Sequence, residues 1–397
     1  MPPGPAKRLD LRQVAFRFVL VFGIVNLFAD MTYEGARSVT GAFLGSLGAT
    51  ATAVGIVAGL GELVGYGLRW FTGLIADRSG RYWTVIFIGY AINLLAVPAL
   101  ALAGNWPMAA ALIVLERTGR AIRKPPVGAL LAEAGKSLGS GWVFGLNEAL
   151  DQTGAMIGPL VVALVLYLHG GYHRAFATLL ISALLCLATI VVARSFALPE
   201  PAPAQRHPGA GRRPFSASFW WLVAAGALVA AGFADFALIA FHLQRTGIVA
   251  VGTIPVYYAA ANATGAVSAL VLGRLFDRWG LPVLLAGFAL PALFAPLVLL
   301  GTAPLVLVGV ILWGLGMAAQ EAILKAVLAN LLPEERRATG FGAFDTCFGL
   351  AWFAGSAIMG WLYDRSVTAA AEFSVATQLV ALPLFIRAWR KGSNPAA

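Results

Sequence analysis

The sequence predicts an all-α membrane protein with twelve transmembrane helices in two pseudo-symmetric six-helix bundles. The 397 residues are 59% hydrophobic and 12% charged, and their mean hydropathy is +0.81. A soluble domain is roughly half apolar and about a quarter charged, so a soluble fold could not bury this much apolar surface. Apolar segments of membrane-spanning length recur along the chain, and motifs of its first half return in order in its second half.

Twelve apolar segments reach the roughly 20 residues that cross a hydrocarbon core of about 30 Å. They cover residues 14–34, 50–76, 82–103, 105–127, 142–168, 172–194, 217–243, 252–276, 281–301, 303–331, 340–363 and 367–389. The polar stretch 195–216 is rich in Pro, Gly and Arg, which is typical of a flexible linker. We therefore expect an N-terminal bundle over 1–194 and a C-terminal bundle over 217–397.

The net charge of +10 follows the positive-inside rule. If the N-terminus is cytoplasmic, 22 Lys and Arg residues fall on the cytoplasmic side and four fall outside. This asymmetry predicts a multi-pass protein of the cytoplasmic (inner) membrane, with both termini and the linker in the cytoplasm. It also explains the basic charge without a nucleic-acid partner. The two cysteines lie in apolar runs without metal-ligand spacing, which indicates core residues.

Four sets of residues recur between the halves and indicate an internal duplication. Phe28-Ala29-Asp30 returns as Phe233-Ala234-Asp235, an offset of 205. Gly73, Asp77, Arg78 and Gly80 return as Gly273, Asp277, Arg278 and Gly280, an offset of 200, and the same register pairs Glu62 with Asn262. Gly119 returns as Gly316, an offset of 197, and Asp151 returns as Asp345, an offset of 194. The offset falls steadily, as small loop deletions in one half would produce.

The loop between the second and third segments resembles the signature loop of the major facilitator superfamily. The resemblance is carried by Gly73, Asp77, Arg78, Gly80 and Arg81, with a degraded copy at Asp277 and Arg278, although Tyr82 replaces a second basic residue. It implies the major facilitator fold and a conformational latch. A carboxylate beside arginines at a helix end can make a charge-assisted contact that breaks when helices part. The alternative is a merely solvated turn.

The fifth segment contains a glycine-rich pattern that resembles a motif of the superfamily's proton-coupled antiporters. The pattern consists of Gly145, Gly154, Gly158 and Pro159, but Val162 and Ala163 stand where the motif usually ends in Gly-Gly. Small residues allow close helix packing, and proline favours a bend. A general packing face is the alternative.

Ionisable residues within apolar segments are costly, and they usually face a cavity or a partner. Neighbouring carboxylates in a dry cavity suit groups that take up and release protons near neutral pH. Asp30 is the first candidate for proton coupling because its position is duplicated, and Asp151 and Asp235 follow. The candidate substrate-binding residues are Asp30, Glu34, Glu62, Arg117, Glu148, His242, Asn262 and Asp345.

Each candidate has a structural alternative. Glu116, Glu321 and Asp345 could equally form ion pairs that hold the bundle together. Arg117 resembles an arginine in helix 4 of drug/proton antiporters, although its spacing departs from the usual pattern. His242 is more typical of an interface residue, but with Asp30 and Glu34 it could form a divalent-cation or protonation site.

A secondary transporter explains the duplication, the paired loops and the buried carboxylates together. The sequence has neither an HExxH zinc motif nor a GxxxxGK[ST] phosphate loop, which disfavours a metalloenzyme and an ATP-driven pump. We expect a monomeric, cofactor-free, proton-coupled antiporter that exports a small cationic or polar solute. The alternatives are a proton-coupled uptake symporter, a divalent-metal exporter, and a membrane sensor on a transporter scaffold.

Overall fold

The computed structural model describes residues 5–138, 140–196, 215–332 and 337–392, and within that part of the chain no strand occurs. Gly73, Asp77, Arg78, Gly145 and Asp277 lie in helices, but their side chains are outside the described set. The helices in chain order are α1 (Pro5–Arg37), α2 (Thr40–Ser46), α3 (Ala51–Ser79), α4 (Tyr82–Ala99), α5 (Trp106–Leu138), α6 (Ser140–Tyr167), α7 (Gly171–Ser195), α8 (Ala217–Gly232), α9 (Phe236–Thr246), α10 (Thr253–Trp279), α11 (Leu281–Ala289), α12 (Phe294–Leu299), α13 (Ala303–Ala318), α14 (Lys325–Leu331), α15 (Arg337–Arg365) and α16 (Val367–Gly392), with short helical turns between some of them.

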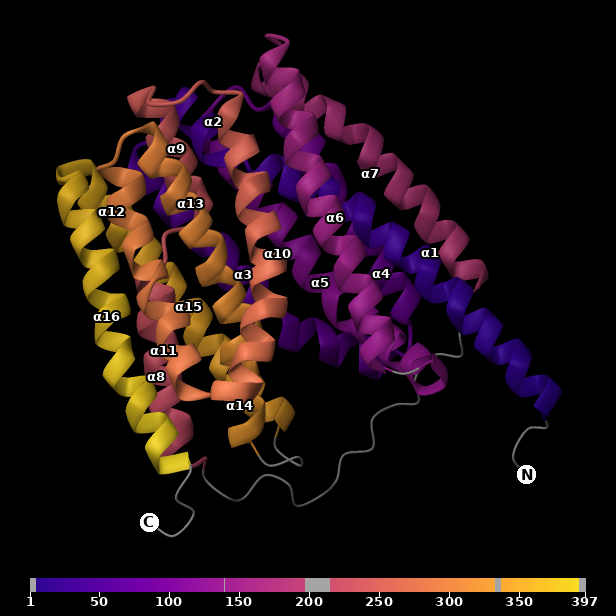
Figure 1. Ribbon diagram of the computed structural model, residues 1–397. Helices are drawn as coiled ribbons and strands as arrows, with labels where there is room; N and C mark the ends of the chain where they lie inside the picture. Colours follow the sequence, from indigo (N-terminus) through magenta and orange to yellow (C-terminus); the bar gives the residue numbers. More distant parts are fainter. Residues whose placement is uncertain (1–4, 139, 197–214, 333–336, 393–397) are drawn as a thin grey trace. The chain divides into compact units, whose positions relative to one another are not determined.

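The first packed unit comprises Met1–Arg37 and Gly67–Arg206. Within it, α1 packs against α6 and α7, and α4 packs against α5 (Figure 1). Glycines allow the closest of these approaches: a Cβ atom at Gly154 or Gly158 of α6 would lie 2.2 Å from the carbonyl oxygen of Leu27 or Met31 of α1. No side chain fits at either position, so α1 and α6 are in backbone contact.

The second packed unit comprises Ser38–Tyr66 and His207–Ala397. Residues 38–66 belong to the first half of the sequence, yet they pack with helices of the second half. A Cβ atom at Gly41 would lie 1.7 Å from the carbonyl oxygen of Ala237, and one at Gly55 would lie 2.2 Å from that of Ser356. The boundaries of the packed units therefore differ from those of the two predicted bundles, 1–194 and 217–397. The two bundles were inferred from the sequence and remain a prediction.

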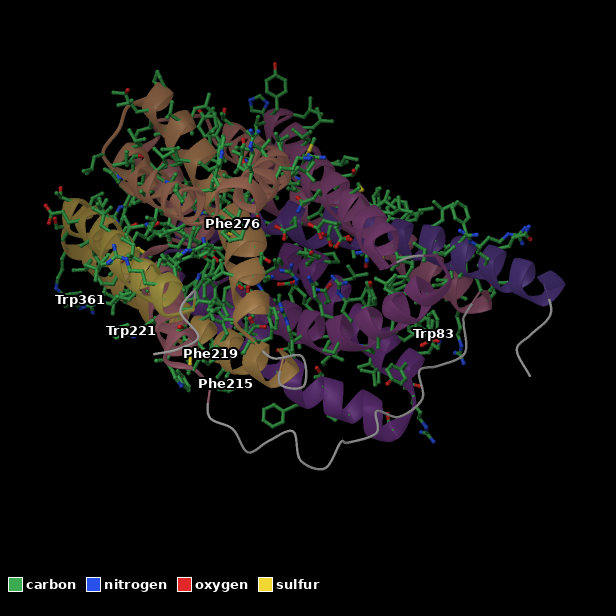
Figure 2. The ribbon with its side chains drawn as sticks, turned by 60° about the horizontal axis from the view of Figure 1, so that its bottom comes forward. Trp83, Phe215, Phe219, Trp221, Phe276 and Trp361 are labelled. Atoms are coloured by element: carbon green, nitrogen blue, oxygen red, sulfur yellow. The ribbon has the colours of Figure 1, made fainter. Side chains whose placement is uncertain are left out.

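Exposed aromatic residues mark the surface of the second unit. Trp361 of α15 is 46% exposed and projects outward (Figure 2). The guanidinium of Arg365 lies 3.7 Å from the centre of its ring. Tryptophan paired with a basic residue near a helix end is typical of an anchor at a membrane interface.

Eleven helical segments of the described chain are long and apolar enough to cross a membrane. The remaining predicted segment, 105–127, is the fourth in chain order and corresponds to α5, whose interior carries several charged residues. The prediction ended this helix near residue 127, but α5 continues through Pro125 and Pro126 to Leu138. Consecutive prolines and adjacent basic residues usually indicate a helix end, so the extension over 128–138 was not predicted. Arg123 and Lys124, which the charge count assigned to the cytoplasmic side, lie inside the helix.

The seventh predicted segment is interrupted, whereas the first is one continuous helix. α8 ends at Gly232 and α9 begins at Phe236. The backbone carbonyls freed by this break are satisfied by buried side chains: Trp313 Nε1 donates to Ala234 O at 2.9 Å, and Ser374 Oγ donates to Gly232 O at 2.6 Å. Such internal partners make a helix break tolerable at membrane depth.

Candidate functional site

Asp30 lies two turns before the end of α1, and it is almost fully buried, with 7% of the residue exposed. The hydroxyl of Tyr33, nearly one turn further along α1, forms a hydrogen bond with its carboxylate. The charged groups around it are Arg123 and Arg120 of α5 and Glu34 of α1. α1 thus presents a carboxylate to a basic face of α5 within the first unit.

The arginines of α5 stack on tyrosine rings. The guanidinium of Arg120 lies 4.4 Å from the ring centre of Tyr33, and that of Arg123 lies 4.3 Å from the ring centre of Tyr90. Arg123 is 3% exposed, and within the described residues its Nε and Nη2 atoms have no hydrogen-bond partner. This pair was not predicted, because the charge count assigned Arg123 to the cytoplasmic side. Its helical spacing from Glu116 is the signal that could have revealed it.

Asp151 of α6 joins the same cluster. Its charged neighbours include Asp30, Lys124 and Arg123. A chain of side-chain hydrogen bonds leads away from it. Asn147 Nδ2 donates to Asp151 Oδ2 at 3.5 Å, Asn26 Nδ2 donates to Asn147 Oδ1 at 2.6 Å, and Tyr90 Oη donates to Asn26 Oδ1 at 2.6 Å. Asp30, Asp151 and the arginines of α5 therefore form one polar cluster within an apolar unit.

Other predicted residues of this unit have local partners. Arg117 Nε lies 3.3 Å from Glu116 Oε2, and Asn93 Nδ2 donates to Glu116 Oε1 at 2.7 Å. Glu34 lies within 3.9 Å of Arg37. Glu148 is exposed and accepts a hydrogen bond from Gln152 at 2.8 Å. These contacts support the ion-pair alternative for Glu116 and Arg117.

Two predicted residues of the second unit have contacts with a structural explanation, and a third is buried. Asp235 is the N-cap of α9, and its Oδ1 accepts the backbone N–H of Ala237 at 3.0 Å. His242 is 2% exposed, and its Nδ1 lies 2.8 Å from the hydroxyl of Tyr363. Glu62 is buried. No group of three or more His, Cys, Asp or Glu residues suited to a metal ion occurs in the described chain.

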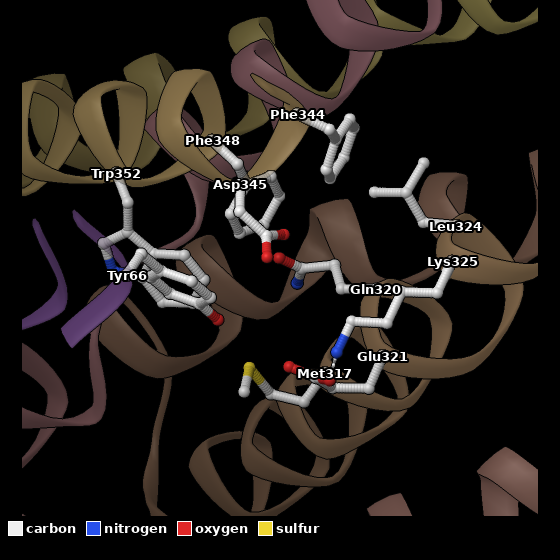
Figure 3. A pocket seen from close by; sticks show the side chains of 10 residues that line it. All are labelled: Tyr66, Met317, Gln320, Glu321, Leu324, Lys325, Phe344, Asp345, Phe348 and Trp352. Carbon is white, nitrogen blue, oxygen red and sulfur yellow. Dashed lines mark hydrogen bonds and ion pairs between the residues drawn. The ribbon is translucent and has the colours of Figure 1, made fainter. Parts of the chain in front are cut away.

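Asp345 lines a pocket in the second unit (Figure 3). Aromatic side chains form one wall, including Phe344, Phe348 and Trp352 of α15. Opposite them lies Glu321, in a π-helical turn over Ala319–Leu324 between α13 and α14. A π-helical turn inside a membrane helix is uncommon and is frequently found at functional sites. Asn262, also predicted to bind substrate, is half-buried and does not line this pocket.

Most residues of the predicted latch have side chains that the structure does not describe. They are Gly73, Asp77, Arg78 and Asp277. The two turn glycines are described: Gly80 has a φ of +63° and its repeat Gly280 has a φ of +61°, a region that favours glycine. Arg81 and Arg278 are exposed. The latch itself remains a prediction.

Comparison with known proteins identifies the family. The sequence matches the profile of the Major Facilitator Superfamily over residues 22–356 and 263–390. An uncharacterized protein of Mycobacterium tuberculosis (strain ATCC 25618 / H37Rv) is 40% identical over 93% of this chain and 92% of its own length. An uncharacterized MFS-type transporter of Methanocaldococcus jannaschii is 26% identical over 88% of this chain and 89% of its own.

A solved structure supports the fold. A peptide transporter, POT, crystallised with sulfate, superposes with a TM-score of 0.76 at 15% sequence identity, covering 97% of this chain and 99% of that one. At this identity the likeness concerns the fold alone. The family match confirms both the predicted fold class and the resemblance that the sequence motifs indicated. The chain belongs to the major facilitator superfamily and is a multi-pass membrane protein of secondary transport.

Proposed function

We propose that this carrier couples solute transport to protons through Asp30 and Asp151, and that it exports its solute by antiport. The observation that carries the proposal is the buried cluster of the first unit, in which Asp30 of α1 interacts with Arg120 and Arg123 of α5 and with Asp151 of α6. A carboxylate in such a setting changes the charge of a dry cluster by one when it takes up a proton.

Proton uptake at Asp30 would rearrange contacts between three helices. The ionised carboxylate is attracted by Arg120 and Arg123, whereas the protonated carboxyl is not. Loss of this attraction loosens the tie between α1 and α5, while Gly154 and Gly158 keep α1 bound to α6. A proton can therefore bias the balance between two carrier conformations, which is what coupling requires.

We place the solute-binding site away from Asp30. We expected a cationic or polar solute from the number of acidic residues within the spans, and Asp30 was a candidate to bind it. Arg120 and Arg123 are the charged neighbours that act most strongly on this carboxylate, and both would repel a cation. Proton and solute then occupy separate sites and compete through the conformations that they favour, not through one shared carboxylate.

The unpaired guanidinium atoms of Arg123 favour one alternative, proton-coupled uptake of an anionic solute. An anion that took the place of Asp30 beside Arg123 would favour protonation of Asp30, so anion and proton would travel together. The two modes differ in the gradient that drives accumulation in vesicles. Antiport requires protons to leave the vesicle as solute enters, whereas symport requires both to enter.

The coupling role can be tested without a known substrate. Spin labels at Ser46 and Thr368, both exposed in the structure, report the distance between the end of α2 and the start of α16. Their distance distribution should change between acidic and mildly basic buffer in the wild-type protein. Asp30→Asn should lose this dependence, and Glu372→Gln, which alters an exposed carboxylate of α16, should keep it. A wild-type pH response in Asp30→Asn would exclude Asp30 and move the role to Asp151.

A further inference from the structure

We propose that the pocket lined by Glu321, Asp345 and Trp352 in the second unit binds the ammonium group of an aromatic amine. This inference rests on the proposed function and names its solute class. The pocket combines two carboxylates with the side chains of Tyr66, Phe344, Phe348 and Trp352 (Figure 3). Carboxylates attract an organic cation, and aromatic faces stabilise both its charge and its apolar body.

The charges of the pocket favour a cation over an anion. Lys325 donates to Glu321, one turn earlier, and thereby neutralises it. Asp345 supplies a second carboxylate, so the formal charge of the lining is −1. Glu321 and Lys325 are both accessible, with side-chain exposures of 51% and 44%, whereas Phe344, Phe348 and Trp352 are buried. A ligand would meet the ion pair at the opening and the aromatic wall inside.

Two buried polar atoms on the lining have no partner within the described residues. They are Oε1 of Gln320, a residue that is 5% exposed, and Nε1 of Trp352, a residue that is 3% exposed. Gln320 Nε2 donates to the carbonyl of Gly316 at 3.2 Å, which leaves the amide oxygen to accept. A buried acceptor without a donor is costly. An ammonium N–H would satisfy it, which favours a primary or secondary amine over a quaternary one.

The duplication supports a division of roles between the two units. Asp345 is the repeat of Asp151. With the offset of 197 that relates Gly119 to Gly316, Gln320 occupies the position of Arg123, and Glu321 occupies that of Lys124. Positions that are basic around the carboxylate of the first unit are therefore neutral or acidic around the carboxylate of the second. The second site therefore has no basic residue at these two positions to repel a cation.

Equilibrium binding of radiolabelled phenethylamine to the purified full-length protein tests this assignment. We expect saturable binding that is competed by unlabelled phenethylamine, and much more weakly by 2-phenylethanol or phenylacetate. Asp345→Asn and Glu321→Gln should each weaken binding by about fivefold or more, because each removes a nearby charge. Lys325→Gln should strengthen binding by a similar factor. Glu372→Gln on α16 is the matched control, and thermal unfolding of each variant checks folding.

The Lys325→Gln variant separates this proposal from an anion site. An anion-binding pocket would lose affinity when the lysine is removed, and phenylacetate would then be the better ligand. Weaker phenethylamine binding by Lys325→Gln, or tighter binding of phenylacetate than of phenethylamine, would overturn the inference. So would the absence of saturable phenethylamine binding, or equal affinity in all variants. Because no pH gradient is applied, this outcome is independent of coupling. A pH response retained in Asp30→Asn defeats the proposed function and leaves the pocket standing.

Discussion

Asp364 at the end of α15 holds the start of α3, and removing its carboxylate should weaken this contact measurably. Its Oδ1 accepts the backbone N–H of Ala51 at 3.0 Å, and its Oδ2 accepts the N–H of Thr52 at 2.8 Å and the hydroxyl of Thr52 at 2.5 Å. The carboxylate therefore acts as an N-cap supplied by a distant segment of the chain. Arg245 lies 4.0 Å from the same carboxylate.

The magnitude follows from the number and exposure of these bonds. Loss of an N-cap costs about 0.5–2 kcal/mol. The Asp364 side chain is 26% exposed, so water replaces part of each lost bond and the effect of Asp364→Ala should lie inside that range. A cost of about 1.4 kcal/mol corresponds to a tenfold change in an equilibrium. Asp364→Asn retains one carbonyl acceptor and should produce a smaller change.

On the topology that we predict, this contact lies on the outer side of the membrane and joins the two halves of the sequence there. Spin-label distances between Ser46 and Thr368 in nanodiscs measure how often the α2–α3 region separates from the start of α16. Asp364→Ala should increase the separated population by roughly fivefold to tenfold, and Glu372→Gln should leave it unchanged. Equal populations in Asp364→Ala and the wild-type protein would refute the reasoning.

Three further predictions concern topology, packing and the latch. Cysteines introduced at Ser195 and Thr246, in a variant without native cysteines, should react with impermeant reagents from opposite sides, and labelling of both from outside would contradict the positive-inside assignment. Gly154→Val should lower the stability of the purified protein by about 1–3 kcal/mol because its side chain meets the α1 backbone, whereas Gly65→Ala, with open space around it, should be neutral in the same thermal unfolding assay. Asp77→Asn should increase the population with long distances between spin labels placed across the cytoplasmic face. An unchanged distance distribution would exclude the latch role of Asp77.

The apolar segments could be predicted from the sequence because hydropathy over 20 residues is a strong local signal. The end of α5 could not be predicted, since consecutive prolines such as Pro125 and Pro126 usually stop a helix. Here the helix continues through both prolines, and local sequence does not indicate this. The break before Asp235 was equally hidden. It depends on Trp313 and Ser374, which are distant in sequence but reach the freed carbonyls.

The candidate site was predicted in part, for a related reason. Asp30, Asp151 and Asp345 were identified because acidic residues in apolar segments are conspicuous. Arg120 and Arg123 of α5 and the aromatic pocket were missed, since positive charge near the end of an apolar segment is assigned to the cytoplasmic side, and buried aromatic residues are the ordinary content of a core. The π-helical turn at Ala319–Leu324 has no pattern in the sequence that we recognise.

Identical residues at duplicated positions need not have the same role. Asp30 lies within the continuous helix α1 near two arginines of α5, while its repeat Asp235 caps the start of α9. Asp235 is already committed to a backbone N–H, so proton uptake there would weaken the helix start that it stabilises. Asp30 caps no helix end, and the charges that attract its carboxylate belong to another helix, α5. This difference is our reason for proposing Asp30 and not Asp235 as the coupling group, although the duplication that first drew attention to Asp30 applies equally to both.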